Sequence, residues 1–320
     1  MDRGGRSRWW RLARRAFAVA LVVALGLALA ERWSAVRPDL ARISPPAVAA
    51  ALAALGAALW CSLRAWRVVL ADLGSPLPTA VAARIFFVGQ IGKYLPGSLW
   101  PVVAQMEMGR DEGVPRTRMA VSFLVNLGLA VLVGLALGLP VLLARGGGPL
   151  ALFALVSVAV ALPLLAQPRL LNAGLTRALA LARRPPLDHD LSRRVLARAV
   201  GWLLACWIAY GLHVWALAVD LGARPLAALP VAVAAYAVAF SVGILVVIAP
   251  AGAGVREVLL VVALAPVLST DAATAVAVVS RLLLTVMDTA AAGLSVVGRR
   301  RHRARTDAAG QVTTGCQVDT

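Results

Sequence analysis

Several apolar runs of this chain are long enough for a helix to cross a lipid bilayer, and they limit the fold more than any other feature. A crossing helix needs about 20 predominantly apolar residues. Segments 47–66, 119–144, 199–219, 226–249 and 272–297 meet or approach this length. Hydrophobic residues make up 61% of the 320 positions and charged residues only 15%, which excludes an ordinary soluble domain. The sequence therefore predicts an all-α integral membrane protein.

Three shorter apolar runs, 16–30, 150–166 and 258–268, bring the predicted number of transmembrane helices to about eight. The first run could instead be a signal peptide, since Ala28-Leu29-Ala30 has the form of a cleavage site. Arginines cluster in residues 1–15, 168–198 and 299–305. Arginine-rich flanks favour the cytoplasm, so we expect a multi-pass protein of the cell membrane with both termini cytoplasmic. Three regions are predicted: a basic N-terminus (1–15), a polytopic domain (16–298) and a basic, then polar, disordered tail (299–320).

Segment 87–105, FVGQIGKYLPGSLWPVVAQ, is apolar but cannot form one regular helix. Glycines loosen its backbone, and its two prolines each remove an amide donor. Irregular backbone at membrane depth occurs only where protein or a water-filled cavity covers it. A full crossing here would place the arginine-rich segment 168–198 outside, so we predict a re-entrant segment on the cytoplasmic side. The residues of this broken-helix motif are Gly89, Gln90, Gly92, Tyr94, Pro96 and Gly97.

A second broken segment, APAGAGVREVLL at 249–260, has the same composition. Pro250, Gly252 and Gly254 interrupt the apolar run. Paired interruptions in the two halves of a polytopic chain are typical of a transport site. They indicate a rough two-fold internal plan, in which two predicted spans precede each broken segment. Four predicted crossings separate the segments, so both are expected to enter from the same face, and no residue-level repeat is evident.

Charged side chains inside the predicted membrane region are candidates for function, because their insertion into hydrocarbon is costly. Lys93, the only lysine, lies in the first broken segment, and the pair Arg256-Glu257 lies in the second. Arg281 and Asp288, with Thr285 between them, share one face of the last span. We hypothesise that Lys93, Arg256 and Arg281 form a cationic path for an anionic lipid headgroup. Glu257 and Asp288 would keep the empty cavity near neutral; alternatively, these carboxylates only pair with arginines to hold helices together.

Other site classes find little support in the sequence. The net charge of +17 is explained by arginines in loops and termini, so we expect no nucleic-acid partner. The three cysteines have no metal-binding spacing, and no metal site is expected. No phosphate-binding loop of the form GxxxxGK[ST] occurs, and we expect no cofactor.

The two broken segments carry a family resemblance. With GQIGKYLPGSLWPVV at 89–103 and PAGAGVRE at 250–257, the chain resembles the membrane-domain family of lysylphosphatidylglycerol synthases, whose members are also described as flippase-like. The resemblance extends from about residue 15 to residue 299. It implies a multi-span domain with broken helices that moves or handles a phospholipid or a lipid-linked headgroup. Because only a short polar tail follows the last predicted span, we do not expect the aminoacyl transfer of full-length synthases.

Three functions remain open at this point. The first is binding and translocation of an anionic phospholipid or lipid-linked headgroup between leaflets, without enzymatic activity. The second is a membrane-embedded transferase with a polyprenyl-phosphate donor, which would use Glu31 or Asp39 as a base. The third is an accessory subunit that positions a lipid-modifying enzyme. The expected partners are a membrane phospholipid or lipid-linked substrate, together with such an enzyme or further copies of the chain.

Overall fold

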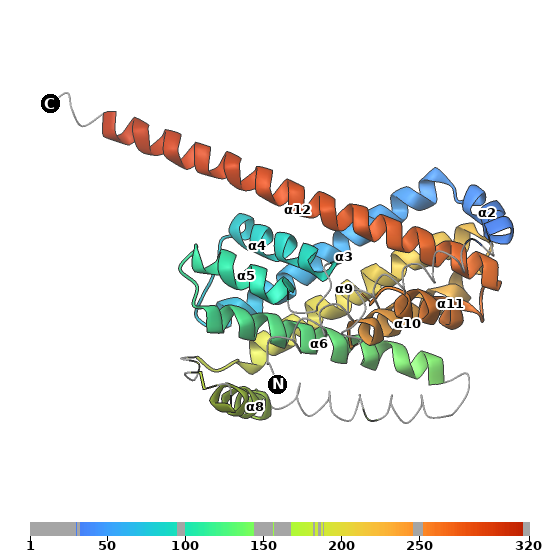
Figure 1. Ribbon diagram of the computed structural model, residues 1–320, viewed down its shortest axis with the longest axis horizontal. Coiled ribbons are helices and arrows are strands. Elements are labelled where there is room, and N and C mark those ends of the chain that lie inside the picture. Colours follow the sequence, from blue (N-terminus) through green and yellow to red (C-terminus); the bar gives the residue numbers. More distant parts are fainter. Residues whose placement is uncertain are drawn as a thin grey trace, which may run out of the picture.

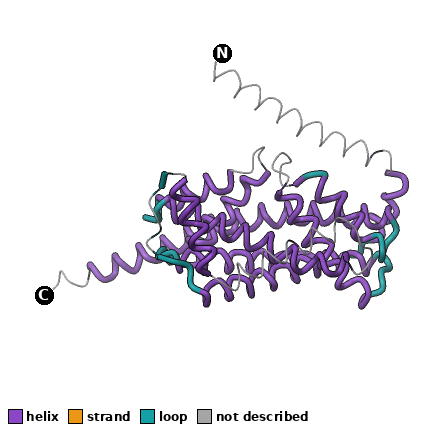
Figure 2. Tube along the Cα trace, turned by 90° about the horizontal axis from the view of Figure 1, so that it is seen from below, coloured by secondary structure: helices purple, strands orange, loops and turns teal. Residues whose placement is uncertain are grey.

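The computed structural model describes residues 33–94, 100–143, 168–181, 189–245 and 252–315, together with positions 30, 156, 183, 184 and 187. Within these ranges all regular secondary structure is helical (Figure 2). The elements are α2 (Trp33–Arg42), α3 (Pro45–Asp72), α4 (Thr79–Ile91), the 3-10 turn η1 (Gly92–Tyr94), α5 (Trp100–Arg110), α6 (Arg116–Leu143), α8 (Pro168–Leu181), α9 (Arg193–Asp220), α10 (Pro225–Leu245), α11 (Val255–Leu264) and α12 (Thr270–Gly315).

Five of these helices are long and apolar enough to cross a membrane. The candidate spans are Pro45–Asp72, Arg116–Val141, Arg193–Asp220, Pro225–Leu245 and Thr270–Val297. They coincide with the five long runs that the sequence predicts, so the all-α membrane class is confirmed. The predicted spans 16–30 and 150–166 lie outside the described residues, apart from positions 30 and 156. The total of about eight crossings therefore stays a prediction.

Helices α3 and α9 make an extensive contact and pack along each other. They run antiparallel, as two matching contacts at their ends demonstrate. Ser44, the N-cap of α3, donates its backbone N–H and its hydroxyl to the carboxylate of Asp220 at the end of α9, at 2.6 and 2.8 Å. Ser192, the N-cap of α9, donates in the same way to Asp72 at the end of α3, at 2.7 and 3.3 Å. Each carboxylate therefore lies at the positive N-terminal end of the other helix.

These contacts belong to a residue-level repeat that sequence inspection missed. Ser44, Asp72 and Leu77 correspond to Ser192, Asp220 and Pro225, and the members of each pair are separated by the same number of residues. The equivalent glycines, Gly74 and Gly222, both have positive φ, at 81° and 100°. Arg67 Nε donates to the Leu77 carbonyl at 2.9 Å, and its counterpart Trp215 donates through Nε1 to the Pro225 carbonyl at 2.8 Å. The two halves are thus related by an approximate two-fold axis perpendicular to α3 and α9.

The two broken segments form hairpins that enter the molecule from opposite ends. Hairpin α4–α5 follows the C-terminal end of α3, and hairpin α10–α11 follows the C-terminal end of α9. Since α3 and α9 are antiparallel, these starting points lie at opposite ends of the pair. The sequence predicted that both broken segments enter from the same face, with 226–249 and 258–268 as independent crossings. In the structure α10 and α11 pack together as one hairpin, and this hairpin starts at the end opposite to hairpin α4–α5.

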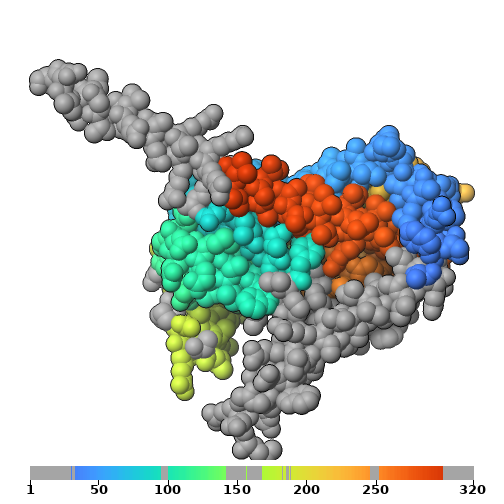
Figure 3. All heavy atoms as spheres, turned by 45° about the horizontal axis from the view of Figure 1, so that its top comes forward, coloured from blue at the N-terminus to red at the C-terminus, as the bar shows by residue number. Residues whose placement is uncertain are grey.

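Each hairpin packs against a long helix of the other half. Helix α4 contacts α12, and α10 contacts α6 (Figure 1). Figure 3 shows α12 along the outer surface beside hairpin α4–α5. This exchange brings both hairpins to the interface between the halves, which is where inverted-repeat transporters place their binding sites.

Two polar segments contain helices, α2 in segment 31–46 and α8 in the arginine-rich segment 168–198. In α8 the residues Leu171, Leu175 and Leu179 recur at helical spacing and pack on the core, a pattern that the many arginines of the segment obscured. Residues 299–315 continue α12 instead of being disordered, because extending an existing helix costs far less than starting one.

Candidate functional site

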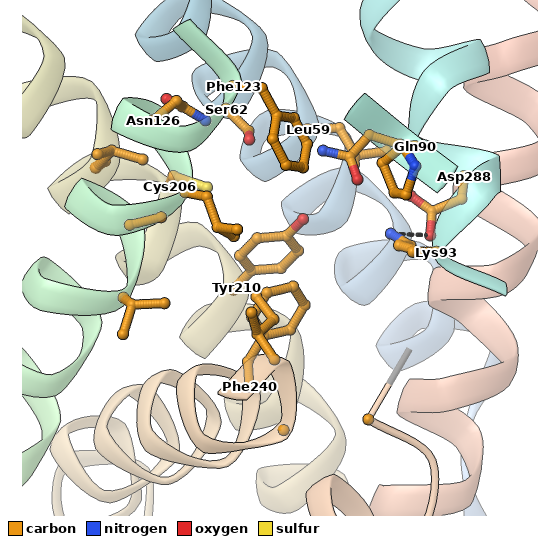
Figure 4. A pocket seen from close by; sticks show the side chains of 18 of the residues that line it. Leu59, Ser62, Gln90, Lys93, Phe123, Asn126, Cys206, Tyr210, Phe240 and Asp288 are labelled. Atoms are coloured by element: carbon orange, nitrogen blue, oxygen red, sulfur yellow. Dashed lines mark ion pairs between the residues drawn. The ribbon is translucent and has the colours of Figure 1, made fainter. Parts of the chain in front are cut away.

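A cavity of about 620 Å³ lies between the two hairpins and helices α3, α6, α9 and α12. Most of its wall is apolar and comes from α3, α6, α9 and α10. Figure 4 shows Tyr210 and Phe240 in its middle and the Lys93–Asp288 pair at one side. The charged residues of its lining are Lys93, Arg256, Arg281 and Asp288. An apolar chamber with charge grouped at one part of its wall has the amphipathic character of a lipid.

The first broken segment brings Lys93 and Tyr94 onto α12. Lys93 Nζ lies 2.6 Å from Asp288 Oδ2. The Tyr94 hydroxyl donates to the same oxygen at 2.6 Å. Asp288 is only 3% exposed, so these two partners stabilise a carboxylate that is removed from solvent.

Two glycines allow the first hairpin to close so tightly. A Cβ on Gly89 would lie 2.5 Å from Cγ of Gln105 on α5. A Cβ on Gly92 would lie 2.8 Å from the backbone nitrogen of Pro101. Side chains larger than hydrogen would therefore push α4 and α5 apart. The close packing of α4 on α5 sets the direction in which η1 presents Lys93 to the cavity.

The second broken segment is shaped by glycines in the left-handed region. Gly252 and Gly254 have φ of +68° and +86°. The Glu257 side chain accepts the backbone N–H of Gly254 at 2.6 Å, which satisfies a free amide at the start of α11. The other oxygen of Glu257 lies 3.3 Å from Nη1 of Arg281. This carboxylate therefore fixes the start of α11 and joins that helix to α12.

Arg256 points away from Glu257 and toward aromatic rings of α10. Its Nη2 donates to the Tyr236 hydroxyl at 2.5 Å. Its guanidinium lies 4.7 Å from the ring centre of Tyr236 and 5.0 Å from that of Phe240. Arg256 is 4% exposed, lines the cavity, and has no carboxylate partner among the residues that the structure describes. Stacking on the rings holds the cation in place while leaving guanidinium N–H groups for a further acceptor.

The family model described as the lysylphosphatidylglycerol synthase TM region matches residues 15–292. The chain belongs to this family. The match includes both hairpins and all five charged residues discussed above. No curated protein is similar enough to this chain to match it.

The structure brings the predicted site residues of this lysylphosphatidylglycerol synthase TM-region protein together in two groups. Lys93 and Tyr94 meet Asp288, and Glu257 meets Arg281; both groups therefore meet on α12. Arg281 and Asp288 thus both meet charged partners from α12, while Arg256, at the start of α11, contacts Tyr236 and Phe240 of α10. Of the broken-helix residues, Gln90, Tyr94 and Gly252 line the cavity. Pro96, Gly97 and Pro250 lie outside the described residues.

The bases proposed for a transferase do not reach this cavity. Asp39 lies in α2, 3.3 Å from Arg42, and is not part of the cavity lining. Glu31 lies outside the described residues. Within the described part of the chain, no group of three His, Cys, Asp or Glu residues is arranged to hold a metal ion.

Sequence reasoning missed the aromatic side chains that contact Arg256. Tyr236 and Phe240 are four residues apart in an otherwise aliphatic span, and this spacing was a usable signal. Tyr210 of α9 stacks on both, with ring centres 5.1 and 5.9 Å away. Asn126 of α6 was also missed. It lines the cavity with a buried amide oxygen that has no hydrogen-bond partner among the residues described.

Proposed function

We propose that this protein binds an anionic phospholipid or lipid-linked headgroup in the central cavity and translocates it between leaflets without covalent chemistry. The observation that carries the proposal is Arg256. It is a buried cation on the wall of an apolar cavity of about 620 Å³, and no carboxylate of the described chain neutralises it. A phosphate is the natural acceptor for a guanidinium fixed in this way.

The inverted arrangement of the hairpins supports movement as well as binding. Hairpin α4–α5 reaches the cavity from one end of the α3–α9 pair, and α10–α11 reaches it from the other. A site between two such repeats opens to alternate sides when one repeat rocks against the other. In this proposal the chain makes about eight crossings of the cell membrane, the α10–α11 pair counted as two, and both termini are cytoplasmic.

The test is a vesicle assay with purified protein. A fluorescently tagged phosphatidylglycerol is placed in both leaflets, and an impermeant reductant quenches the outer one. The protein should expose the inner-leaflet probe faster than protein-free vesicles do. Arg256→Gln removes a charged hydrogen-bonding partner and should slow this exposure about tenfold or more. Arg224→Gln, a matched change at an exposed arginine outside the cavity, should leave the rate unchanged.

Other outcomes select the competing functions. A covalently altered lipid recovered from the vesicles would identify a transferase. Vesicles that show neither movement nor modification until a lipid-modifying enzyme is added would identify an accessory subunit. Equal rates for wild type and the Arg256→Gln variant, with normal insertion of both, would refute the role of Arg256.

A further inference from the structure

A second basic site lies outside the cavity, in a groove between the C-terminal end of α3 and the N-terminal end of α9. The groove has a volume of about 400 Å³. Three arginines line it, Arg64, Arg67 and Arg198, together with a single carboxylate, Asp72. Asp72 already accepts the backbone N–H and hydroxyl of Ser192, which leaves the groove with an excess of positive charge.

Two of the three arginines differ in the contacts that they make within the protein. Arg67 donates Nε to the Leu77 carbonyl at 2.9 Å and Nη1 to the Thr79 hydroxyl at 2.7 Å, so it holds the turn between α3 and α4. Arg64 makes no hydrogen bond within the described chain; its guanidinium lies over the rings of Trp60 and Trp202, at 5.9 and 5.2 Å. Stacking fixes its plane and leaves its N–H groups for an acceptor.

The internal repeat shows that the fold does not require these charges. The positions equivalent to Arg64 and Arg67 in the second half are Leu212 and Trp215. Trp215 makes the same carbonyl contact as Arg67, so an uncharged side chain is sufficient for the structural role. The position equivalent to Arg198 is Ala50. The three arginines of the groove at one end of the α3–α9 pair therefore have uncharged equivalents at the other end.

We infer that this groove binds the phosphate group of an anionic ligand at the membrane surface. Trp60 is 46% exposed beside Arg64, and exposed tryptophans mark the depth of the lipid headgroups. Arginine excess places this end on the cytoplasmic side, where anionic lipids attract basic groups. The ligand is a phosphate of an anionic phospholipid from that leaflet or of a small soluble compound; both present the same group to Arg64 and Arg198. The site is independent of the central cavity and of Arg256.

The experiment is a binding titration by native mass spectrometry on the full-length protein. The probes are phosphatidylglycerol, phosphatidylcholine and inorganic phosphate. The variant R64Q/R198Q removes two charges from the groove and spares Arg67. Its matched control is R169Q/R177Q, which removes two exposed charges from α8. Each surface arginine is worth about 1 kcal/mol toward an anionic lipid, so R64Q/R198Q should weaken phosphatidylglycerol binding about thirtyfold and the control far less.

The outcomes separate the two sources and the null result. Loss of phosphatidylglycerol binding in R64Q/R198Q, with no displacement by inorganic phosphate, assigns the groove to a lipid. Displacement of the lipid by inorganic phosphate in the wild type, but not in R64Q/R198Q, assigns it to a soluble phosphate compound. Equal binding by R64Q/R198Q and its control overturns the inference. R64K/R198K retains the charge without the planar fork and checks that any loss does not come from misfolding. The same titration on R256Q should leave the groove affinity unchanged.

Discussion

The pair formed by Lys93 and Asp288 should be energetically asymmetric, because the two side chains differ in burial. Asp288 keeps 2% of its side-chain surface exposed and Lys93 keeps 19%. Breaking a buried pair costs about 3–5 kcal/mol when the remaining charge has no other solvation. Lys93→Met leaves the carboxylate buried and should cost about 3 kcal/mol of the free energy of unfolding. Asp288→Asn leaves the Lys93 ammonium without its partner, but this group can reach solvent. The change should therefore cost about half as much free energy of unfolding as Lys93→Met.

The double variant K93M/D288N separates the interaction between Lys93 and Asp288 from the cost of leaving one of these charges without its partner. It leaves no buried net charge and keeps an acceptor for the Tyr94 hydroxyl. Replacing both partners of a buried pair is close to neutral, so we expect the double variant to cost about 1 kcal/mol or less. The two single changes together cost about 4–5 kcal/mol, which gives a coupling free energy of about 3–4 kcal/mol.

The assay is equilibrium unfolding of the purified protein in mixed micelles, followed by circular dichroism. The pair Arg116–Glu107 provides the control, since its atoms are 2.5 Å apart but both side chains are 50% exposed. Its coupling should fall within about 0–1 kcal/mol. A Lys93–Asp288 coupling no larger than that of Arg116–Glu107 would show that burial of the pair does not contribute to the fold, and the reasoning from burial would then be wrong.

Further predictions concern the two hairpins. Tyr94→Phe removes the second partner of the buried carboxylate and should cost about 1 kcal/mol in the same unfolding assay. Gly92→Ala places a methyl group 2.8 Å from the Pro101 backbone nitrogen and should separate α4 from α5, measured as faster labelling of a cysteine introduced into the hairpin. Gly252→Ala, at φ +68°, should cost at least about 1–2 kcal/mol. Gly201→Ala in α9 meets nothing within 4 Å and should be neutral or slightly stabilising, which makes it the control for both glycine changes.

Sequence reasoning predicted the elements whose signal is local. The long helices follow from apolar length, and the hairpin α4–α5 follows from glycine, proline and lysine in one apolar run. The shared face of Arg281 and Asp288 follows from helical spacing, and their placement on one helix is confirmed. Neighbouring helical residues point about 100° apart, so Arg256 and Glu257 had to diverge, but nothing local indicates the partner that each one meets. Those partners, Tyr236 and Arg281, are fixed by packing between distant segments.

The antiparallel relation of the two halves also could not be predicted from local sequence patterns. It depends on Ser44 meeting Asp220 and Ser192 meeting Asp72, across the full length of α3 and α9. Short polar residues at helix ends occur in many proteins, and only their reciprocal pairing reveals the two-fold axis. The sequence Leu-Gly after each aspartate was visible, at 73–74 and 221–222, but two residues alone do not establish a repeat.

Two carboxylates lie beside the site proposed for an anion, and α12 explains their presence. Arg281 and Asp288 are seven residues apart, so they lie two turns and about 10 Å apart on one face of this helix. Each is paired with a different hairpin, one of which enters from each end of the molecule. A phosphate that draws Lys93 or Arg281 toward Arg256 leaves Asp288 or Glu257 buried without its partner, which costs several kcal/mol. In the proposed mechanism the hairpin then moves away from α12 and admits water to the released carboxylate. In the proposed mechanism the carboxylates therefore couple arrival of the headgroup to opening of one hairpin.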